Sequence, residues 1–138
     1  MITHIYFDWS GTLAKRGSKA TFVYGTSVAE KCATLLPGTK RMLSTLVRRG
    51  YTIGLITNTS KPADLFLKAL EECDMRKYFK GAILISSQGG LQKKPAPSMF
   101  LRALSEDGIE ADQAMMVGND YKKDILGAKR SGLNTLHV

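Results

Sequence analysis

Short apolar runs alternate along this chain with segments in which apolar residues recur every three or four positions. Five runs have the length of β-strands: residues 2–7, 51–57, 81–86, 113–118 and 133–138. Helical spacing marks five further segments: residues 26–36, 39–50, 60–72, 96–108 and 122–132. Strands separated by helices of about ten residues pair in parallel, because the chain must cross back before each new strand. The pattern predicts an α/β fold, a three-layer Rossmann-like sandwich with a central, mostly parallel five-stranded sheet.

Turn and capping residues support several of these boundaries. Thr39 and Ser60 have hydroxyls suited to cap the helices that they precede, and Gly108 is suited to end one. The run ATFVY, residues 20–24, predicts a further short strand, so that residues 14–24 would form a hairpin at the sheet edge. No linker or repeat interrupts the chain, and 138 residues fit one domain, residues 1–138.

The charge balance favours anionic partners. Twenty Lys and Arg residues stand against twelve Asp and Glu residues, which gives a formal net charge of +8. Such an excess attracts phosphorylated metabolites and nucleic acid alike. A basic surface without any specific partner would have the same composition, so charge alone does not choose between these alternatives.

Cysteine, histidine and apolar content narrow the class of protein further. Cys32 and Cys73 are far apart and lack C-x-x-C spacing, so we expect two reduced thiols in a cytoplasmic protein. With His4 and His137 as the only histidines, a zinc site is not expected. No apolar run approaches the ~18 residues of a membrane span, so we expect no membrane partner.

Polar residues follow the predicted strands at positions suited to chemistry. Asp8 follows the first strand, Thr57 ends the second, and Asp120 follows the fourth, with Asp124 one helical turn later. Ligands of an open parallel sheet gather at the carboxyl ends of its strands. Carboxylates and a lysine such as Lys94 suit a phosphate bound beside Mg²⁺. Taken singly, each residue has a structural explanation as a turn former, a cap or a solvated charge.

Four motifs occur in order at these strand ends: YFDWSGTLA, GLITNTS, KKPAPSMF and MMVGNDYKKDILGAKRSG. Together they resemble the haloacid dehalogenase (HAD) superfamily of phosphotransferases with an aspartate nucleophile. Any one motif alone would be a weak signal, but the four span nearly the whole chain in register. The resemblance implies a phosphatase, a phosphomonoester hydrolase that works through an aspartyl-phosphate.

The resemblance also implies a role for each catalytic position. Asp8 would be the nucleophile that attacks phosphorus. Thr57 would hydrogen-bond a phosphoryl oxygen, helped by the backbone N–H of Asn58. Lys94, rather than Lys93, would bridge Asp8 and the phosphate.

A Mg²⁺ cofactor is implied in the same way. Its ligands would be the Asp8 carboxylate, the backbone carbonyl of Ser10, and Asp120 and Asp124, directly or through water. Trp9, beside the nucleophile, is placed either to touch the substrate or simply to pack the loop, and the sequence leaves these two alternatives open.

Two positions depart from the pattern of the family. Ser10 stands where a second aspartate usually serves as general acid and base, and a hydroxyl is too weak for that role near neutral pH. Losing such a group typically costs about 10²- to 10⁴-fold in rate, most for poor leaving groups. Asn119 stands where many relatives carry a metal-binding aspartate, so Asp120 would substitute one place later. We therefore expect a slow phosphatase.

No separate cap domain is expected, because residues 14–36 can hold only a hairpin and a helix between the first motif and the next helix. The site would then be open to a large phosphorylated substrate or covered by a second subunit in an oligomer. Two alternative functions stay open: a catalytically weak module that binds a phosphorylated ligand or protein, and a nucleic-acid 3′-end phosphatase. The latter rests on charge alone, since no aromatic and basic stripe for stacking bases is present.

Overall fold

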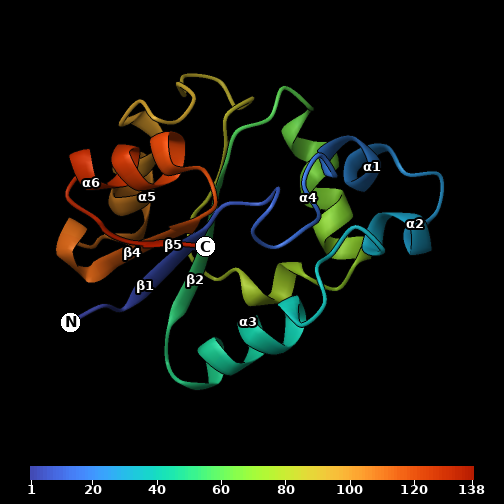
Figure 1. The fold of residues 1–138 in the computed structure, drawn as a ribbon, viewed down its shortest axis with the longest axis horizontal. Helices are drawn as coiled ribbons and strands as arrows, with labels where there is room; N and C mark the ends of the chain where they lie inside the picture. Colours follow the sequence, from blue (N-terminus) through green and yellow to red (C-terminus); the bar gives the residue numbers. More distant parts are fainter.

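A computed structural model describes residues 1–138 and contains one five-stranded sheet in the order β3-β2-β1-β4-β5. All four neighbouring pairs are parallel, which confirms the predicted α/β fold (Figure 1). The strand bounds are close to those predicted: β1 His4–Phe7, β2 Thr52–Thr57, β3 Ile83–Ile85, β4 Ala114–Gly118 and β5 Asn134–His137.

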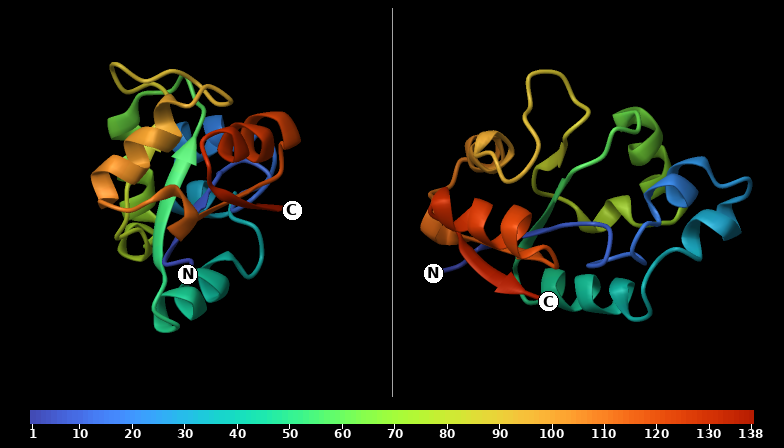
Figure 2. Two further views of the ribbon diagram at one scale, coloured as in Figure 1. Left: turned by 90° about the vertical axis from the view of Figure 1, so that its left-hand side faces the viewer. Right: turned by 45° about the horizontal axis from the view of Figure 1, so that its top comes forward.

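Helices cover both faces of the sheet and complete three layers (Figures 1 and 2). One face carries α3 Thr39–Arg48, α4 Ala63–Glu72 and the short helix η1 Arg76–Tyr78, and α1 Lys19–Tyr24 and α2 Val28–Cys32 pack against α4 on the same side (Figure 1). The other carries α5 Ser98–Asp107, η2 Ala111–Gln113, the π-helical turn η3 Tyr121–Leu126 and α6 Gly127–Arg130.

Successive side chains of β1 point to opposite faces of the sheet and so belong to two separate hydrophobic cores. Ile5 and Phe7 belong to the core under α3 and α4, whereas Tyr6 belongs to the core under α5. The Tyr6 hydroxyl donates a hydrogen bond of 2.5 Å to the Asp107 carboxylate at the end of α5, and burial together with this contact raises the tyrosine pKa far above its ordinary value. Both faces of the sheet are therefore buried, as is typical of parallel strands.

The predicted strand at residues 20–24 and the predicted hairpin at residues 14–24 are wrong. This segment forms helix α1, whose buried residues are Phe22 and Val23. The Phe22 ring lies 4.4 Å from that of Trp9 and 5.3 Å from that of Phe66 in α4, measured between centroids. The residues have high β-propensity, but packing of one helical face onto these rings outweighs it.

The expectation of two reduced thiols is also wrong. Cys32 at the end of α2 and Cys73 after α4 form a disulfide, with Cα atoms 5.3 Å apart and a separation of 41 positions in sequence. Lys31 and Glu72 form an ion pair of 3.1 Å directly beside it. The spacing of the two cysteines along the chain does not show that α2 and α4 pack side by side. Because the cysteines form a disulfide, they no longer indicate a cytoplasmic location.

Two of the predicted helix caps differ from the structure. The cap position of α4 is Pro62, not Ser60, and Thr39 is the first residue of α3, where its hydroxyl donates to the carbonyl of Leu13 at 2.9 Å. Gly108 ends α5 in a left-handed conformation, as predicted. None of the helices combines the length and the apolar character that a membrane crossing would require.

Candidate active site

The loop after β1 places Asp8 at the carboxyl edge of the sheet. The Asp8 N–H donates to the Val117 carbonyl of β4, so the residue extends the strand by one position. The chain then turns, with three successive N–H groups pointing to the Trp9 carbonyl. Gly11 has a φ of 82°, and a Cβ there would collide with the side chain of Asn119. A glycine at this position therefore lets the first and fourth motifs approach closely.

Trp9 belongs to the core and does not face the site. Its side chain is fully buried, and its ring packs against Phe22 and, edge to face at 5.3 Å, against Phe66. The expectation that Trp9 contacts the substrate is therefore wrong, and the alternative of loop packing is correct. The indole N–H is left buried without a hydrogen-bond partner.

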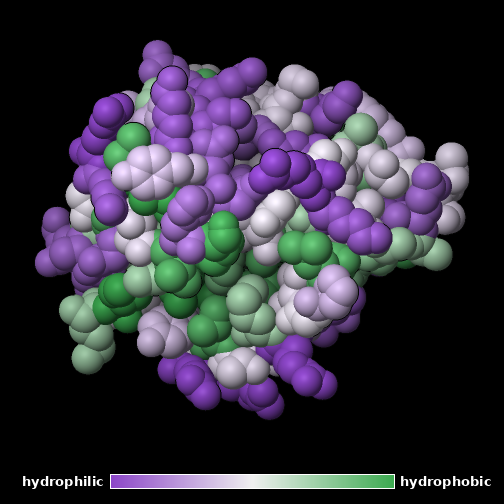
Figure 3. All heavy atoms as spheres, viewed as in Figure 1, coloured by the Kyte–Doolittle hydropathy of each residue, from purple (hydrophilic) through white to green (hydrophobic).

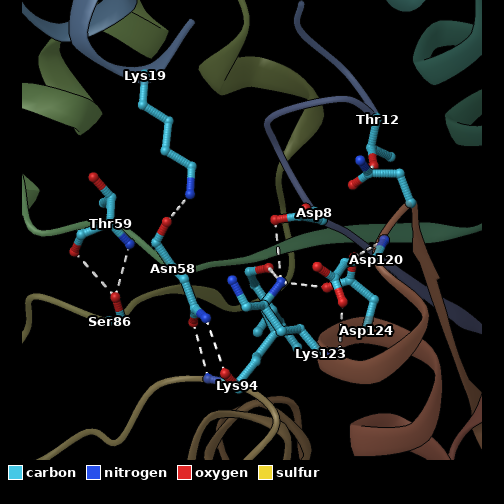
Figure 4. Close-up of polar contacts among 12 residues, drawn as sticks. Asp8, Thr12, Lys19, Asn58, Thr59, Ser86, Lys94, Asp120, Lys123 and Asp124 are labelled. Carbon is cyan, nitrogen blue, oxygen red and sulfur yellow. Dashed lines mark hydrogen bonds and ion pairs between the residues drawn. The ribbon is translucent and has the colours of Figure 1, made fainter. Parts of the chain in front are cut away.

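Lys94 lies at the centre of the site and contacts two carboxylates. Its Nζ donates to Asp8 Oδ1 at 3.1 Å, to Asp124 Oδ1 at 2.7 Å and to the Ile56 carbonyl at 2.7 Å (Figure 4). The residue is only 3% exposed. A buried ammonium with three acceptors holds the two carboxylates close together although both are negative. Lys93, the other candidate, is exposed.

Asn58 fixes the backbone of Lys94 from the end of β2. Its side-chain amide donates to the Lys94 carbonyl at 3.0 Å, and its side-chain oxygen accepts from the Lys94 N–H at 2.9 Å. This paired contact is visible in Figure 4. Asn58 thus positions the lysine, a role that sequence reasoning did not assign to it.

Asp124 and Asp120 come from the turn η3 that follows β4. Asp124 is fully buried; its Oδ2 accepts from the Asp120 N–H at 3.1 Å. Burial raises the pKa of Asp124 and the nearby Asp8 carboxylate adds to this, whereas the ammonium of Lys94 opposes it. The Asp120 carboxylate accepts from the Lys123 N–H at 2.9 Å and so caps the turn.

A pocket of about 330 Å³ opens above these residues, and no hydrophobic residue lines it. Its wall contains three acidic, four basic and three neutral polar residues: Asp8, Asp120 and Asp124; Arg16, Lys19, Lys94 and Lys123; and Ser10, Asn58 and Asn119. The structure thus brings together most of the residues predicted from the strand ends. On the face of the molecule seen in Figure 1, hydrophilic side chains cover the upper part and apolar ones lie below the centre (Figure 3).

Three basic residues of the pocket were missed by sequence reasoning. Arg16 and Lys19 belong to the segment predicted as a hairpin, and Lys123 lies within the fourth motif, next to Asp124. Lys19 donates from Nζ to the Asn58 carbonyl, and its burial lowers the pKa of the ammonium. No local motif marks Arg16 and Lys19, since their position depends on the path of α1.

Thr57 and Ser10 have different surroundings. Thr57 is fully buried, does not line the pocket, and has a hydroxyl without a hydrogen-bond partner. The Ser10 hydroxyl lines the pocket and accepts from the Gly17 N–H at 2.8 Å. The contact of Thr57 with a phosphoryl oxygen stays a prediction, for which its unpaired hydroxyl has the capacity.

The donor set of the pocket fits a hard divalent cation. Carboxylate, amide and backbone oxygens are available, and no thiolate or imidazole lines the pocket. No three acidic, cysteine or histidine side chains converge on one point. A magnesium ion does not require such a cluster, because it commonly binds one or two carboxylates and keeps several waters.

The fold and the site together define a Rossmann-like α/β protein whose polar pocket is built around an aspartate and a lysine at the carboxyl ends of the strands. Comparison with known proteins identifies the family. The chain belongs to the haloacid dehalogenase-like hydrolase family, whose model matches residues 7–138.

Two curated relatives show where this chain lies in the family. It is 34% identical over 101 residues to glyceraldehyde 3-phosphate phosphatase of Pyrococcus abyssi, which covers 73% of this chain. It is 35% identical over 109 residues to phosphoglycolate phosphatase of Escherichia coli K12, which covers 79% of it. The matched segment spans only 41% of the length of each relative.

Solved structures share the fold over nearly the whole chain. A protein from Listeria monocytogenes serotype 4b superposes with a TM-score of 0.82 at 24% identity, covering 99% of this chain and 78% of that one. The HAD phosphatase from Thermococcus onnurineus superposes with a TM-score of 0.73 at 20% identity, covering 99% and 86%. At these identities the likeness supports the fold alone.

Proposed function

We propose that this protein is a Mg²⁺-dependent phosphatase that uses Asp8 as its nucleophile. The observation that carries the proposal is the buried Lys94 ammonium, held between Asp8 and Asp124 on the floor of a pocket without apolar lining. The two curated relatives described above are named as phosphatases of small phosphorylated compounds, which supports the same class of reaction. The proposed substrate is therefore a phosphomonoester.

Four groups of the pocket would hold the ion, directly or through water molecules: the carboxylates of Asp8, Asp120 and Asp124 and the backbone carbonyl of Ser10. A bound Mg²⁺ would offset the negative charge of the phosphoryl group. Asp120 has a free carboxylate oxygen beyond the one that caps η3, since a single oxygen accepts from Lys123. Asn119, the second position that departs from the family pattern, lines the pocket with a neutral amide. Asp120 and Asp124 are then the acidic residues that the fourth motif contributes to the pocket.

In the first step, an Asp8 carboxylate oxygen forms a bond to phosphorus while the bond from phosphorus to the leaving oxygen breaks. Lys94 keeps the carboxylate in place and contributes a positive charge next to the phosphoryl group. Water then attacks the aspartyl-phosphate, which releases inorganic phosphate and restores Asp8.

Ser10 slows the first step for ordinary alkyl phosphates, whose leaving oxygen needs a proton, and it leaves the water of the second step without a general base whatever the substrate. Its oxygen accepts from the Gly17 N–H, and its own proton is too weakly acidic to be passed to an alkoxide near neutral pH. The leaving oxygen must then be protonated by water. The same feature favours a second candidate, a module that binds phosphorylated ligands in this pocket with little or no turnover.

The test is phosphate release from an aryl phosphate, which needs little protonation of its leaving group. We expect turnover with Mg²⁺, loss of turnover with a chelator, and a loss of at least about 10³-fold in Asp8→Asn. Asp112→Asn is the matched control, because Asp112 is exposed and lies before β4, at the opposite edge of the sheet. Turnover that persists in Asp8→Asn or in chelator would contradict the proposal. Phosphate binding without turnover would favour the binding module.

A further inference from the structure

The pocket contains more positive charge than the reacting phosphoryl group requires. Lys94 is already paired with Asp8 and Asp124. Arg16, Lys19 and Lys123 also line the pocket, yet none of these three forms a salt bridge within the chain. Unpaired cations gathered in one concave site favour an anionic ligand with more than one charged group.

Lys19 lies on the opposite side of Asp8 from Asp120 and Asp124 (Figure 4), and Arg16 lines the same pocket. Both basic residues belong to the segment of residues 14–36, which follows the nucleophile loop. Lys19 reaches from α1 to the backbone of Asn58, so that Asn58 lies between Lys19 and Lys94 (Figure 4). The reacting phosphoryl group would be held at Asp8 and Lys94, and the leaving group would extend toward Arg16 and Lys19.

A second cavity lies beside Arg16. It has a volume of about 400 Å³ and shares Arg16 with the first pocket. Ser18 also lines it, and the hydroxyl of Ser18 is buried without a hydrogen-bond partner. A leaving group that extends from Asp8 past Arg16 would reach a space lined by two basic residues, Lys15 and Arg16, and one acidic residue, Glu30.

We propose that Arg16 and Lys19 bind a second anionic group, a carboxylate or a phosphate, on the leaving-group side of the substrate. The inference rests on the proposed phosphatase function and deepens it by naming the substrate class. A guanidinium presents paired donors that match both carboxylate and phosphate oxygens, and a lysine beside it adds a point charge. The preferred substrates are then phosphomonoesters with a second negative group a few bonds from the ester oxygen.

Three compounds with one two-carbon skeleton test the proposal: 2-phosphoglycolate, ethane-1,2-diyl bisphosphate and 2-hydroxyethyl phosphate. For the wild-type chain we expect kcat/KM to be at least about tenfold higher for a compound with the second anion than for the neutral alcohol. A preference for the carboxylate, the bisphosphate or both supports the proposal and identifies the anion.

Arg16→Gln and Lys19→Met should each reduce that preference by about fivefold or more, mainly through KM. Arg16→Lys should retain part of it, because the charge stays while the paired donors are lost. Lys122→Gln is the matched control, since Lys122 is exposed and does not line the pocket but carries the same charge. Thermal unfolding of each variant shows whether it is folded.

The outcomes separate this inference from the proposed function. Equal kcat/KM for the three compounds, or equal losses on all three in Arg16→Gln and Lys19→Met, would overturn the inference and leave the phosphatase in place. No turnover of any compound by a folded wild-type chain that also fails on the aryl phosphate would overturn the proposed function, and the inference would fall with it.

Discussion

Lys94 is the residue on which the geometry of the site depends. A lysine that is 3% exposed loses most of its hydration, and two carboxylates and a carbonyl replace it. The arrangement is reciprocal, because Asp8 and Asp124 would repel each other without the ammonium between them. This mutual dependence makes Lys94 important for stability as well as for chemistry.

Lys94→Met should therefore destabilise the fold as well as abolish turnover. Removing one partner of a buried charge cluster leaves the other charges uncompensated, which typically costs about 3–5 kcal/mol. Urea unfolding in the presence of a chelator measures the free energy of unfolding. Lys93→Met, on the exposed neighbour, should change it by less than about 0.5 kcal/mol. Equal midpoints for Lys94→Met and the wild type would show that the ammonium does not hold the carboxylates together.

Ser10 sets the limit on the rate in our proposal, and it can be tested in the opposite direction. Ser10→Asp should raise kcat for alkyl phosphates by about 10²-fold, because a carboxyl group can protonate the leaving oxygen. The Gly17 N–H that now donates to the Ser10 hydroxyl can donate to a carboxylate instead, so the loop need not rearrange. Ser10→Asn, which has the size but not the acidity, is the control. A similar gain in both variants would mean that protonation is not limiting.

At the scale of elements, the segment of residues 14–36 is the part of the chain that shapes the site beyond the four motifs. It is fastened to the rest of the fold by the Cys32–Cys73 disulfide, by the Lys31–Glu72 ion pair and by the packing of Phe22. The positions of Arg16 and Lys19 in the pocket depend on the disulfide, the ion pair and this packing contact. Helices as short as α1 and α2 would not be stable by themselves.

Reduction of the disulfide should lower the free energy of unfolding by about 2–4 kcal/mol. A crosslink between residues 41 positions apart restricts the unfolded chain, and its loss restores that freedom. Unfolding by urea with and without a reductant measures the difference. The Cys32→Ser/Cys73→Ser double variant should match the reduced protein and be insensitive to reductant. A reductant effect that persists in this variant would have to come from something other than the disulfide.

The elements also show which parts of the structure the sequence could predict. The five strands and the helices α3, α4 and α5 have local apolar periodicity, and the pattern of residues within each is sufficient to predict them. Helix α1 is short, and its residues favour a strand until Trp9 and Phe66 pack against Phe22. Those contacts join distant parts of the chain, so no local pattern reports them. The disulfide was missed for the same reason.

The residues of the site also fall into two groups: those that the sequence could predict and those whose position depends on contacts between distant parts of the chain. Asp8, Lys94 and Asp124 could be predicted, because motifs at strand ends necessarily meet at one edge of a parallel sheet. The pairing of Asn58 with the Lys94 backbone depends on the path of the loop before α5, and the positions of Arg16 and Lys19 depend on α1. The two alternatives for Trp9 could not be separated, since a sequence does not show which way a loop side chain points; the structure buries this ring in the core.

At the scale of the whole molecule, the salt dependence of substrate binding can come from the net charge of +8 or from the local charge of the pocket. These two sources lead to different expectations. Exposed charges act over about 10 Å at 0.1 M ionic strength, so substrate binding should respond mainly to the residues of the pocket. We expect kcat/KM for an aryl phosphate to fall severalfold between low and moderate NaCl, at fixed Mg²⁺. The Arg16→Gln/Lys123→Gln double variant should lose most of this dependence.

The control removes the same number of charges far from the site. Arg48 and Arg49 lie at the end of α3, which leads into the start of β2, the edge of the sheet opposite the pocket. The Arg48→Gln/Arg49→Gln double variant should therefore keep the salt dependence of the wild type. If both double variants reduce it equally, the overall charge of the molecule rather than the local field of the pocket attracts the substrate. The unpaired cations around Asp8 would then have no special part in binding.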